Sequence, residues 1–264
     1  MSEFKTITQS RSDRGVATLT LARPAKRNAI DATMIAELRT ALAGIERDGS
    51  ILGVVLTAEG DTFCAGADLT LMQALSQGDR AARLAQAGEL AGLLEDMDRS
   101  SKPTICRVSG AAYGGGVGLI ATCDIVIASQ AARFALTEVR LGLIPATIGP
   151  FVVRRVGEAA ARRLMVSACT FDAAEAQRLG LVSVVVPPGE LDKAVEREVA
   201  DVLKGAPGAI AAAKAMCRDL GRRTASADAN ATAERLAKQL ETDEAKAGLA
   251  AFFAGRPPPW RGRP

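Results

Sequence analysis

Apolar residues form two kinds of run that alternate along the chain. Residues 16–22 (VATLTLA) alternate between apolar and polar, whereas residues 51–58, 104–108 and 124–129 are apolar almost throughout. Short, uninterrupted apolar runs are typical of parallel strands that are covered on both faces. Asp31 is a suitable N-cap for a helix whose apolar residues recur at helical spacing, namely Met34, Ile35, Leu38, Leu42 and Ile45. The pattern therefore predicts an α/β fold.

The pattern changes towards the C-terminus. Asp172 is placed to cap a short helix, Gly180 to end it, and Pro187-Pro188 to close the strand that follows. From about residue 190 onwards the sequence predicts helix. We therefore expect a core over residues 1–200 and a smaller helical region over residues 201–264.

Composition excludes several classes of function. Aromatic residues make up only 3% of the chain and the net charge is +3, which argues against a nucleic-acid stacking surface and a general DNA binder. The chain has no histidine, so a Ser-His-Asp triad is excluded and a metal site is not expected.

Cysteine spacing and the N-terminus bear on the cellular compartment. The five cysteines show no CxxC spacing, so we expect reduced thiols and neither a disulfide framework nor a zinc site. The N-terminal sequence MSEFKTITQS has no apolar core typical of a signal peptide. These features predict a cytoplasmic protein without membrane attachment.

A glycine cluster carries the first indication of chemistry. In AAYGGGVGLIATCD (111–124), Gly114 to Gly116 open a predicted helix. Such a helix start presents unpaired N–H groups and the positive end of the helix dipole, which favour a phosphate or a carbonyl oxygen that gains negative charge. The GxGxxA match from Gly116 favours dinucleotide binding only weakly, because the next strand ends in Ser129 where an acidic residue is wanted.

Two further segments could complete a site. DTFCAGADLTLM (61–72) is a second junction between a strand and a helix, with Asp68 placed to cap the helix. Two such junctions could each aim one N–H group at the same oxygen, as an oxyanion hole requires. In RFALTEVRLGLIP (133–145), Glu138 lies among residues typical of buried or turn positions, so it serves either in a surface ion pair or as a functional carboxylate.

Together, FCAGADL, GGGVGL and TEVRLGLIP resemble the enoyl-CoA hydratase/isomerase (crotonase) superfamily. The flanking RPAKRNAI and FDAAEAQRLGLVSVVVP extend the resemblance over essentially the whole chain. The resemblance implies a crotonase-like spiral of ββα units with a C-terminal helical region that serves trimerisation and covers the substrate tunnel. It also implies acyl-CoA thioester substrates, trimers or pairs of trimers, and no cofactor beyond the coenzyme A that is part of the substrate.

The resemblance also assigns roles to individual residues. The N–H groups of Ala67 and Gly115 would form the oxyanion hole, and Glu138 would be the catalytic acid/base. Lys26 and Arg27 would lie near the CoA phosphates, and Ala65 to Leu69 would hold the adenine and pantetheine portions. The full set of residues expected to contact substrate is Lys26, Arg27, Ala65, Asp68, Leu69, Gly114 and Gly118.

One position departs from the family pattern. Hydratases that resemble this chain carry two glutamates, and the first falls on Gly118. Glu138 could then act alone, as in isomerases that convert a 3-enoyl-CoA to a 2-enoyl-CoA. Alternatively, Gly118 makes room for a branched or glutaconyl-type substrate, or another acid such as Glu89 or Glu95 holds the water. The leading prediction is a hydratase that adds water to a 2-enoyl-CoA, the isomerase is the alternative, and a CoA-thioester binding protein without catalysis is a third class.

Overall fold

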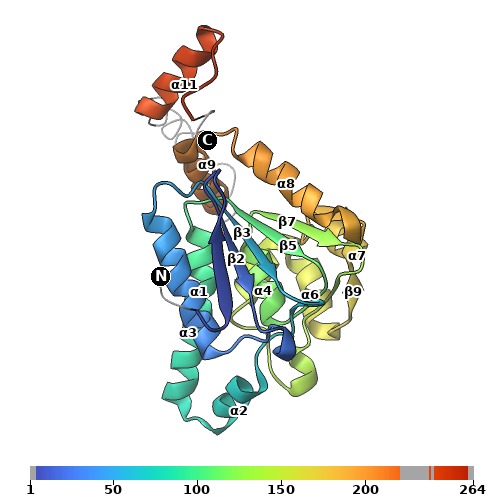
Figure 1. The fold of residues 1–264 in the computed structure, drawn as a ribbon. Coiled ribbons are helices and arrows are strands. Elements are labelled where there is room, and N and C mark those ends of the chain that lie inside the picture. The colour runs from blue at the N-terminus through green and yellow to red at the C-terminus, as the bar shows by residue number, and fades with distance from the viewer. Residues whose placement is uncertain (1–3, 221–237, 239–240, 261–264) are drawn as a thin grey trace.

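The computed structural model describes residues 4–220, 238 and 241–260 (Figure 1). Within these residues, ten strands form two sheets. The strands are β1 (Ile7–Arg11), β2 (Val16–Leu21), β3 (Gly53–Ala58), β4 (Thr62–Cys64), β5 (Thr104–Val108), β6 (Ala111–Tyr113), β7 (Ile125–Ser129), β8 (Arg133–Ala135), β9 (Phe171–Asp172) and β10 (Val184–Val186). The larger sheet has the order β1-β2-β3-β5-β7-β10 and the smaller has the order β4-β6-β8-β9.

The helices lie between and after these strands. The α-helices are α1 (Ala32–Arg47), α2 (Leu69–Gln77), α3 (Arg80–Arg99), α4 (Gly115–Thr122), α5 (Gly149–Val156), α6 (Glu158–Ser167), α7 (Ala173–Arg178), α8 (Leu191–Val202), α9 (Pro207–Leu220) and α11 (Asp243–Phe253). Short 3₁₀ helices are η1 (Pro24–Lys26), η2 (Glu138–Leu141) and η3 (Pro188–Glu190).

Successive pairs of strands divide between the two sheets. β3, β5 and β7 are parallel neighbours in the larger sheet, and the strand that follows each of them, β4, β6 or β8, lies in the smaller sheet. Helical structure then returns the chain to the larger sheet. This arrangement is a spiral of ββα units, so the predicted fold class is confirmed. Within the described residues, the larger sheet departs from parallel pairing only at β1 and β2.

Local capping explains where two of the predicted helices begin. The Asp31 side chain accepts a hydrogen bond from Met34 N at 2.8 Å at the start of α1, and Asp172 accepts one from Glu175 N at 2.8 Å at the start of α7. Gly180, just beyond α7, has a φ of +81°, which glycine adopts at little cost. These three predictions are confirmed.

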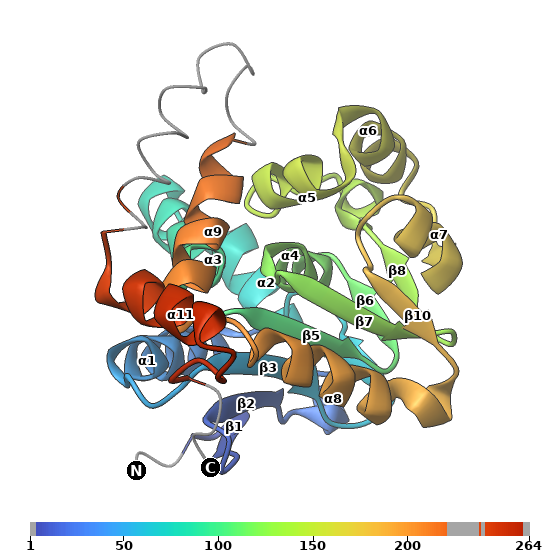
Figure 2. The same cartoon turned by 90° about the horizontal axis from the view of Figure 1, so that it is seen from above.

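Both faces of the larger sheet are covered. Figure 2 shows α4 on one face and α8 on the other. The α8 face is held by a small apolar cluster comprising Val16, Val55, Ile105, Ile127, Val186, Leu191, Ala194, Val195 and Val199. On the other face, α1, α3 and α4 bury the main core. Coverage on both faces is the reason that the central strands are apolar at most positions.

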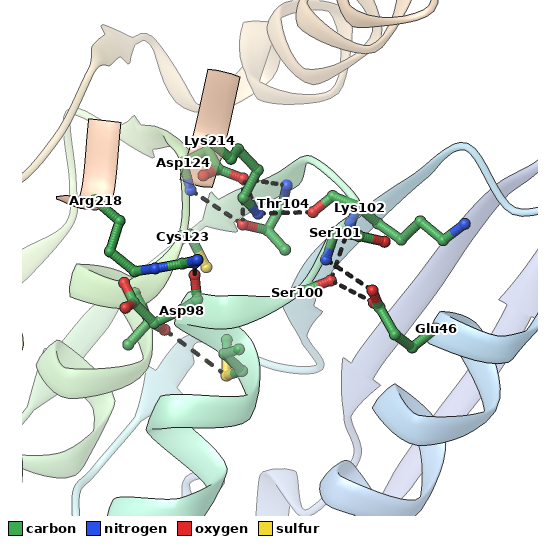
Figure 3. Close-up of polar contacts among 12 residues, drawn as sticks. Glu46, Asp98, Ser100, Ser101, Lys102, Thr104, Cys123, Asp124, Lys214 and Arg218 are labelled. Atoms are coloured by element: carbon green, nitrogen blue, oxygen red, sulfur yellow. Dashed lines mark hydrogen bonds and ion pairs between the residues drawn. The ribbon is translucent and has the colours of Figure 1, made fainter. Parts of the chain in front are cut away.

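Charged side chains of α9 fasten it to the core (Figure 3). Lys214 Nζ donates to Lys102 O at 2.7 Å and pairs with Asp124 Oδ2 at 2.7 Å. Asp124 Oδ2 also accepts hydrogen bonds from Thr104 N and Oγ1, at 2.7 and 2.8 Å. Arg218 Nη1 donates to Asp98 O at 3.1 Å. The start of the helical C-terminal region is therefore tied to the segment that leads into β5.

The chain beyond α9 folds back in part. The Trp260 indole N–H donates to Lys204 O at 3.1 Å, which anchors the proline-rich tail beside the start of α9. Figure 1 shows α11 at the end of the molecule remote from α2. No helix in the described ranges has the length and apolar character needed to cross a bilayer. All five cysteines are free thiols, and Cys64, Cys106 and Cys123 are buried.

Candidate active site

The two junctions singled out in the sequence lie side by side. β4 and β6 are parallel neighbours, with Cys64 paired to Ala112. The chain then turns at Gly66, whose φ is +95°, and a Cβ placed there would lie 3.2 Å from Tyr113 O. Only glycine allows both this backbone angle and this close approach without strain. The sheet therefore brings together the two loops that precede α2 and α4.

Ala67 and Gly115 each present a backbone N–H group at these junctions. Ile30 forms a β-bridge with Ala67: Ile30 N donates to Gly66 O at 2.7 Å, and Asp68 N donates to Ile30 O at 2.8 Å. These two hydrogen bonds engage the Gly66 carbonyl and the Asp68 N–H, and leave the N–H of Ala67 itself without a partner in the bridge. Gly115 is the first residue of α4, where an N–H group has no partner within the helix. Neither N–H donates a hydrogen bond to any residue that the structure describes. Gly115 N lies 4.0 Å from the Cβ position of Gly66.

Glu138 lies at the start of η2 and faces the first turn of α4. Its Oε1 is 3.0 Å from the point where a Cβ on Gly114 would stand. Its Oε2 is buried and has no hydrogen-bond partner among the described residues. Burial raises the pKa of Glu138 above the ordinary value of a glutamate, because desolvation disfavours the charged form. The surface ion pair that the sequence left open is absent from the described part of the chain.

The space beside Gly118 is already filled. A Cβ on Gly118 would overlap Ile148 Cγ2, and it would lie 3.0 Å from Ile148 Cβ and 3.6 Å from Leu94 Cδ1. Gly118 is itself buried within α4. In this arrangement the side chain of Ile148 occupies the space that a Cβ on Gly118 would take, so the absence of a side chain at Gly118 does not by itself leave an open space there.

The alternative acids lie on α3 in exposed ion pairs. Glu89 Oε2 is 2.7 Å from Arg39 Nη1, and Glu95 Oε1 is 3.2 Å from Arg99 Nη1. Because Arg39 belongs to α1, the Glu89 side chain points towards that helix. Glu95 lines a cavity of about 530 Å³ between α3 and the segment from Ala146 to Arg154. The structure does not join either carboxylate to Glu138.

Asp68 stabilises the first junction. Its Oδ1 accepts hydrogen bonds from Thr70 N at 2.9 Å and Thr70 Oγ1 at 2.5 Å, and its Oδ2 lies 3.0 Å from Arg23 Nη2. The hydrogen bonds from Thr70, together with the Arg23 guanidinium, lower the pKa of Asp68 to about 2. The predicted capping role is confirmed. Both oxygens are engaged in the loop, so a direct contact between the Asp68 carboxylate and substrate is not supported.

The basic loop is held against the first junction by its backbone. Ala65 N donates to Arg27 O at 2.9 Å. Asn28, fully buried, donates from Nδ2 to Glu59 O and Thr62 O, both at 2.8 Å. The side chains of Lys26 and Arg27 are exposed and form no ion pair within the described ranges. They are therefore free to meet an anionic group beside Ala65.

One predicted substrate contact, Leu69, and three residues that were not predicted from the sequence lie near the two junctions. Leu69 is 81% exposed at the start of α2, an apolar surface next to the loop. Arg23, Asn28 and Ile148 were not identified from the sequence. Arg23 pairs with both Asp31 and Asp68, at 3.0 Å each. Arg23 and Asn28 belong to the quoted motif RPAKRNAI, but the sequence gave no sign of their contacts with Asp68, Glu59 and Thr62, which are 31 to 45 residues away.

The described residues contain no group of three or more cysteine, aspartate or glutamate side chains suited to a metal ion. The arrangement instead offers two unpaired N–H donors and one desolvated carboxylate. Such a set can stabilise a developing oxyanion and move a proton next to it.

Comparison with known proteins identifies the same family as the sequence motifs. The family model described as enoyl-CoA hydratase/isomerase matches residues 11–263. A protein named "Probable enoyl-CoA hydratase" from Rhizobium meliloti is 38% identical over 250 residues, which cover 91% of this chain and 92% of that protein. The crystal structure of an enoyl-CoA hydratase from Shewanella pealeana is 38% identical with a TM-score of 0.94, covering 98% of this chain and 97% of that one. An enoyl-CoA hydratase structure from Mycobacterium smegmatis is 33% identical with a TM-score of 0.91, covering 97% and 99%.

Proposed function

Because the chain belongs to the enoyl-CoA hydratase/isomerase family, whose members act on acyl-CoA thioesters, we propose that it converts a 3-enoyl-CoA to a 2-enoyl-CoA with Glu138 as the sole acid/base. The observation that carries this proposal is the Glu138 carboxylate itself. It is desolvated, its Oε2 has no partner among the described residues, and it lies beside the turn that presents Gly115 N.

The proposed reaction needs one carboxylate. Glu138 removes a proton from C2 of the substrate, and the electron pair moves into the thioester to give a dienolate. The N–H groups of Ala67 and Gly115 donate to the thioester oxygen, which carries the negative charge. Losing one such donor typically lowers the rate on the order of 10²–10³-fold. The double bond then lies between C2 and C3, and Glu138 returns the proton to C4.

Its raised pKa suits Glu138 to this task. A general base works best when its pKa lies near the operating pH, because it must both take up and release the proton. Burial away from water supplies that shift without a second charged group.

Hydration of a 2-enoyl-CoA is the second candidate. It is favoured by the relatives, since the Rhizobium meliloti protein and the Shewanella pealeana structure are both named for enoyl-CoA hydratase. In that reaction water adds its hydroxyl group to C3 and a proton to C2. Glu138 would have to serve both transfers, since Gly118 provides no carboxylate. A branched or glutaconyl-type acyl group belongs to this second candidate.

Further properties belong to the same proposal. Coenzyme A enters as part of the substrate and no separate cofactor is needed. The exposed Lys26 and Arg27 bind its phosphates, as their place beside Ala65 allows. The subunits assemble as trimers or pairs of trimers, and the enzyme works in the cytoplasm on acyl-CoA esters of fatty acid metabolism.

The first experiment compares three substrates. The purified protein is incubated separately in deuterated water with crotonyl-CoA, a 3-enoyl-CoA and a branched glutaconyl-type CoA, and product masses are followed. We expect deuterium uptake without added water from the 3-enoyl ester. Gain of one water from a 2-enoyl ester, faster than any isomerisation, would replace the proposal by the second candidate.

Variants test the assigned residues. Glu138→Gln is expected to lower turnover by about 10²–10⁴-fold, because it removes the group that transfers the proton, while acyl-CoA binding persists. Glu158→Gln is the matched control, since Glu158 is an exposed glutamate paired with Arg162 on α6. Gly115→Val tests the oxyanion hole, and an unchanged rate would remove Gly115 from it. Full activity of Glu138→Gln would contradict the proposal.

A further inference from the structure

Arg155 closes the C-terminal end of α4, the helix whose first residue is Gly115. Its Nη1 donates to Cys123 O at 2.6 Å and to Asp124 O at 3.4 Å, and its Nε donates to Gly180 O at 3.0 Å. Cys123 is the C-cap of α4, and Gly180 follows α7. Figure 2 shows α5, the helix that carries Arg155, on the side of α4 away from the sheet. One guanidinium therefore joins α5, the end of α4 and the turn after α7.

The charge of Arg155 is not paired with a carboxylate in the parts of the chain that the structure describes. Its three acceptors are all backbone carbonyl groups. Asp124 and Asp98, which lie beside Cys123 (Figure 3), are paired with Lys214 and Arg154 instead. Burial lowers the pKa of Arg155, because desolvation disfavours the charged form. An unpaired positive charge thus lies at the end of α4.

The two ends of α4 act on a nearby charge in opposite ways. A helix presents about half a positive charge at its N-terminus and about half a negative charge at its C-terminus. Gly115 N lies at the positive end and Cys123 O at the negative end. The negative end therefore opposes any negative charge that develops on an oxygen bound to Gly115 N. A cation that is hydrogen-bonded to Cys123 O offsets this opposition.

The helix is short enough for a charge at one end to act at the other. α4 has eight residues, which at about 1.5 Å per residue span about 12 Å. Residues 116–122 are buried, so little water lies between the two ends. Coulomb's law with an effective dielectric constant of about 20 gives a roughly sixfold to tenfold effect on an enolate about 12–15 Å away. Ions and water around the partly exposed guanidinium reduce this effect towards about threefold.

We propose that Arg155 is a positioning residue for the oxyanion hole, which fixes the C-terminal end of α4 and offsets the negative end of its dipole, so that Gly115 N binds an enolate oxygen more strongly. This inference rests on the proposed function, which places the enolate oxygen at Gly115 N. Arg155 acts through α4 and not by contact with the substrate. A purely structural role would need only the hydrogen bonds to the three carbonyl groups.

The decisive measurement is the pKa of a bound enolate. Acetoacetyl-CoA is a β-keto thioester whose enolate spreads its charge onto the thioester oxygen and absorbs at longer wavelength than the neutral form. It is titrated with an excess of the full-length protein, and Glu138 is present in every variant, so its own titration cancels from the differences. Arg155→Met should raise the pKa of the bound probe by about 0.5 to 1, which corresponds to a threefold to tenfold weaker hold on the enolate. It should also lower kcat about threefold to tenfold, with KM changed less than about twofold, because the effect belongs to the charged intermediate.

Two further variants separate the charge from the hydrogen bonds. Arg155→Lys keeps the charge and should change the pKa of the probe by less than about 0.3, a twofold effect. Arg162→Met is the matched control, because Arg162 is exposed on α6, pairs with Glu158 and removes the same unit of charge; it should leave the pKa unchanged. Lys214 and Arg218, which also bind near this end of α4, are the same throughout. The inference is overturned if Arg155→Met leaves the pKa of the probe unchanged, or if either of the other variants shifts it equally.

Folding and function are judged separately. If Arg155→Met does not melt cooperatively, Arg155→Gln keeps N–H donors for Cys123 O without the charge, and we expect the same rise in the pKa of the probe; an unchanged pKa overturns the inference. Failure of the proposed function would show in the wild type as hydration without isomerisation, whereas the titration of the probe needs no turnover. If the wild type does not lower the pKa of acetoacetyl-CoA below its value in solution, the oxyanion hole at Gly115 and the role of Arg155 are both rejected.

Discussion

Glu138 Oε1 lies 3.0 Å from the point where a Cβ on Gly114 would stand. Gly114 is also the residue that precedes α4, with a φ of +47° and a ψ of −115°. The same glycine thus turns the chain into the helix that presents Gly115 N and leaves room for the carboxylate. A side chain at Gly114 would compete with Glu138 for one place.

Gly114→Ala is therefore expected to displace the carboxylate. A misplacement of about 1 Å can lower turnover roughly 10²-fold, so we expect a fall of that order in kcat with a smaller change in KM. Gly44→Ala is the control, because a Cβ on Gly44 meets nothing within 4 Å. Steady-state kinetics with a 3-enoyl-CoA checks the effect. An unchanged kcat in Gly114→Ala would show that the contact does not position Glu138.

The acidic limb of the pH–rate profile should report Glu138. The base must be ionised, so kcat/KM falls as the pH drops through its pKa. Burial raises that pKa, and the limb should therefore lie above pH 4.3, roughly the ordinary value of a glutamate. A profile of kcat/KM against pH measures its position. A limb at the ordinary value would contradict a desolvated Glu138.

Glu138→Gln should also change the pH dependence of stability. Because the folded-state pKa is raised, the favourable contribution of the protonated form is present below the unfolded-state pKa and is lost as the pH rises through the folded-state pKa. A neutral glutamine avoids this loss. We expect Tm of the variant to exceed that of the wild type at pH 8 and the difference to shrink near pH 4, measured by thermal melts. An equal difference in Tm between variant and wild type at both pH values would argue against a raised pKa of Glu138 as the cause.

Lys214 should contribute measurably to stability. Its side chain is 11% exposed and bonds both Asp124 and Lys102 O. Lys214→Met should cost about 1–3 kcal/mol, the range for a partly buried hydrogen bond to a charged group. Lys193→Met removes an exposed pair with Glu190 and should change the free energy of unfolding by less than about 1 kcal/mol. Denaturant unfolding of both variants measures this contrast, and equal losses would reject a special role for the α9 contact.

Helix caps and apolar strands, which depend on residues close together in the chain, could be predicted from the sequence. The caps at Asp31 and Asp172 join groups three residues apart, so the residue type and its place before an apolar run were sufficient. The strands over 104–108 and 124–129 were predicted from their apolar character, although the second begins at Ile125. Asp68 was also predicted as a cap. Its second partner, Arg23, lies 45 residues away and gave no local signal.

The functional site was only partly determined in this way. The motifs identified Glu138 and the two junctions, because glycine clusters and an isolated carboxylate are chemically unusual where they stand. They left open whether Glu138 was paired and what surrounded Gly118. Both questions concern contacts between segments that are distant in the chain.

By itself, the sequence determined the alternation of central strands with helices, the family and the groups able to perform chemistry, since each depends on residue type and spacing. Only the tertiary structure decided that Glu138 Oε2 is buried without a partner among the described residues, and that Ile148 fills the space beside Gly118. The physical reason is that desolvation and excluded volume depend on every neighbour in space. Those neighbours meet only when the spiral of ββα units has closed.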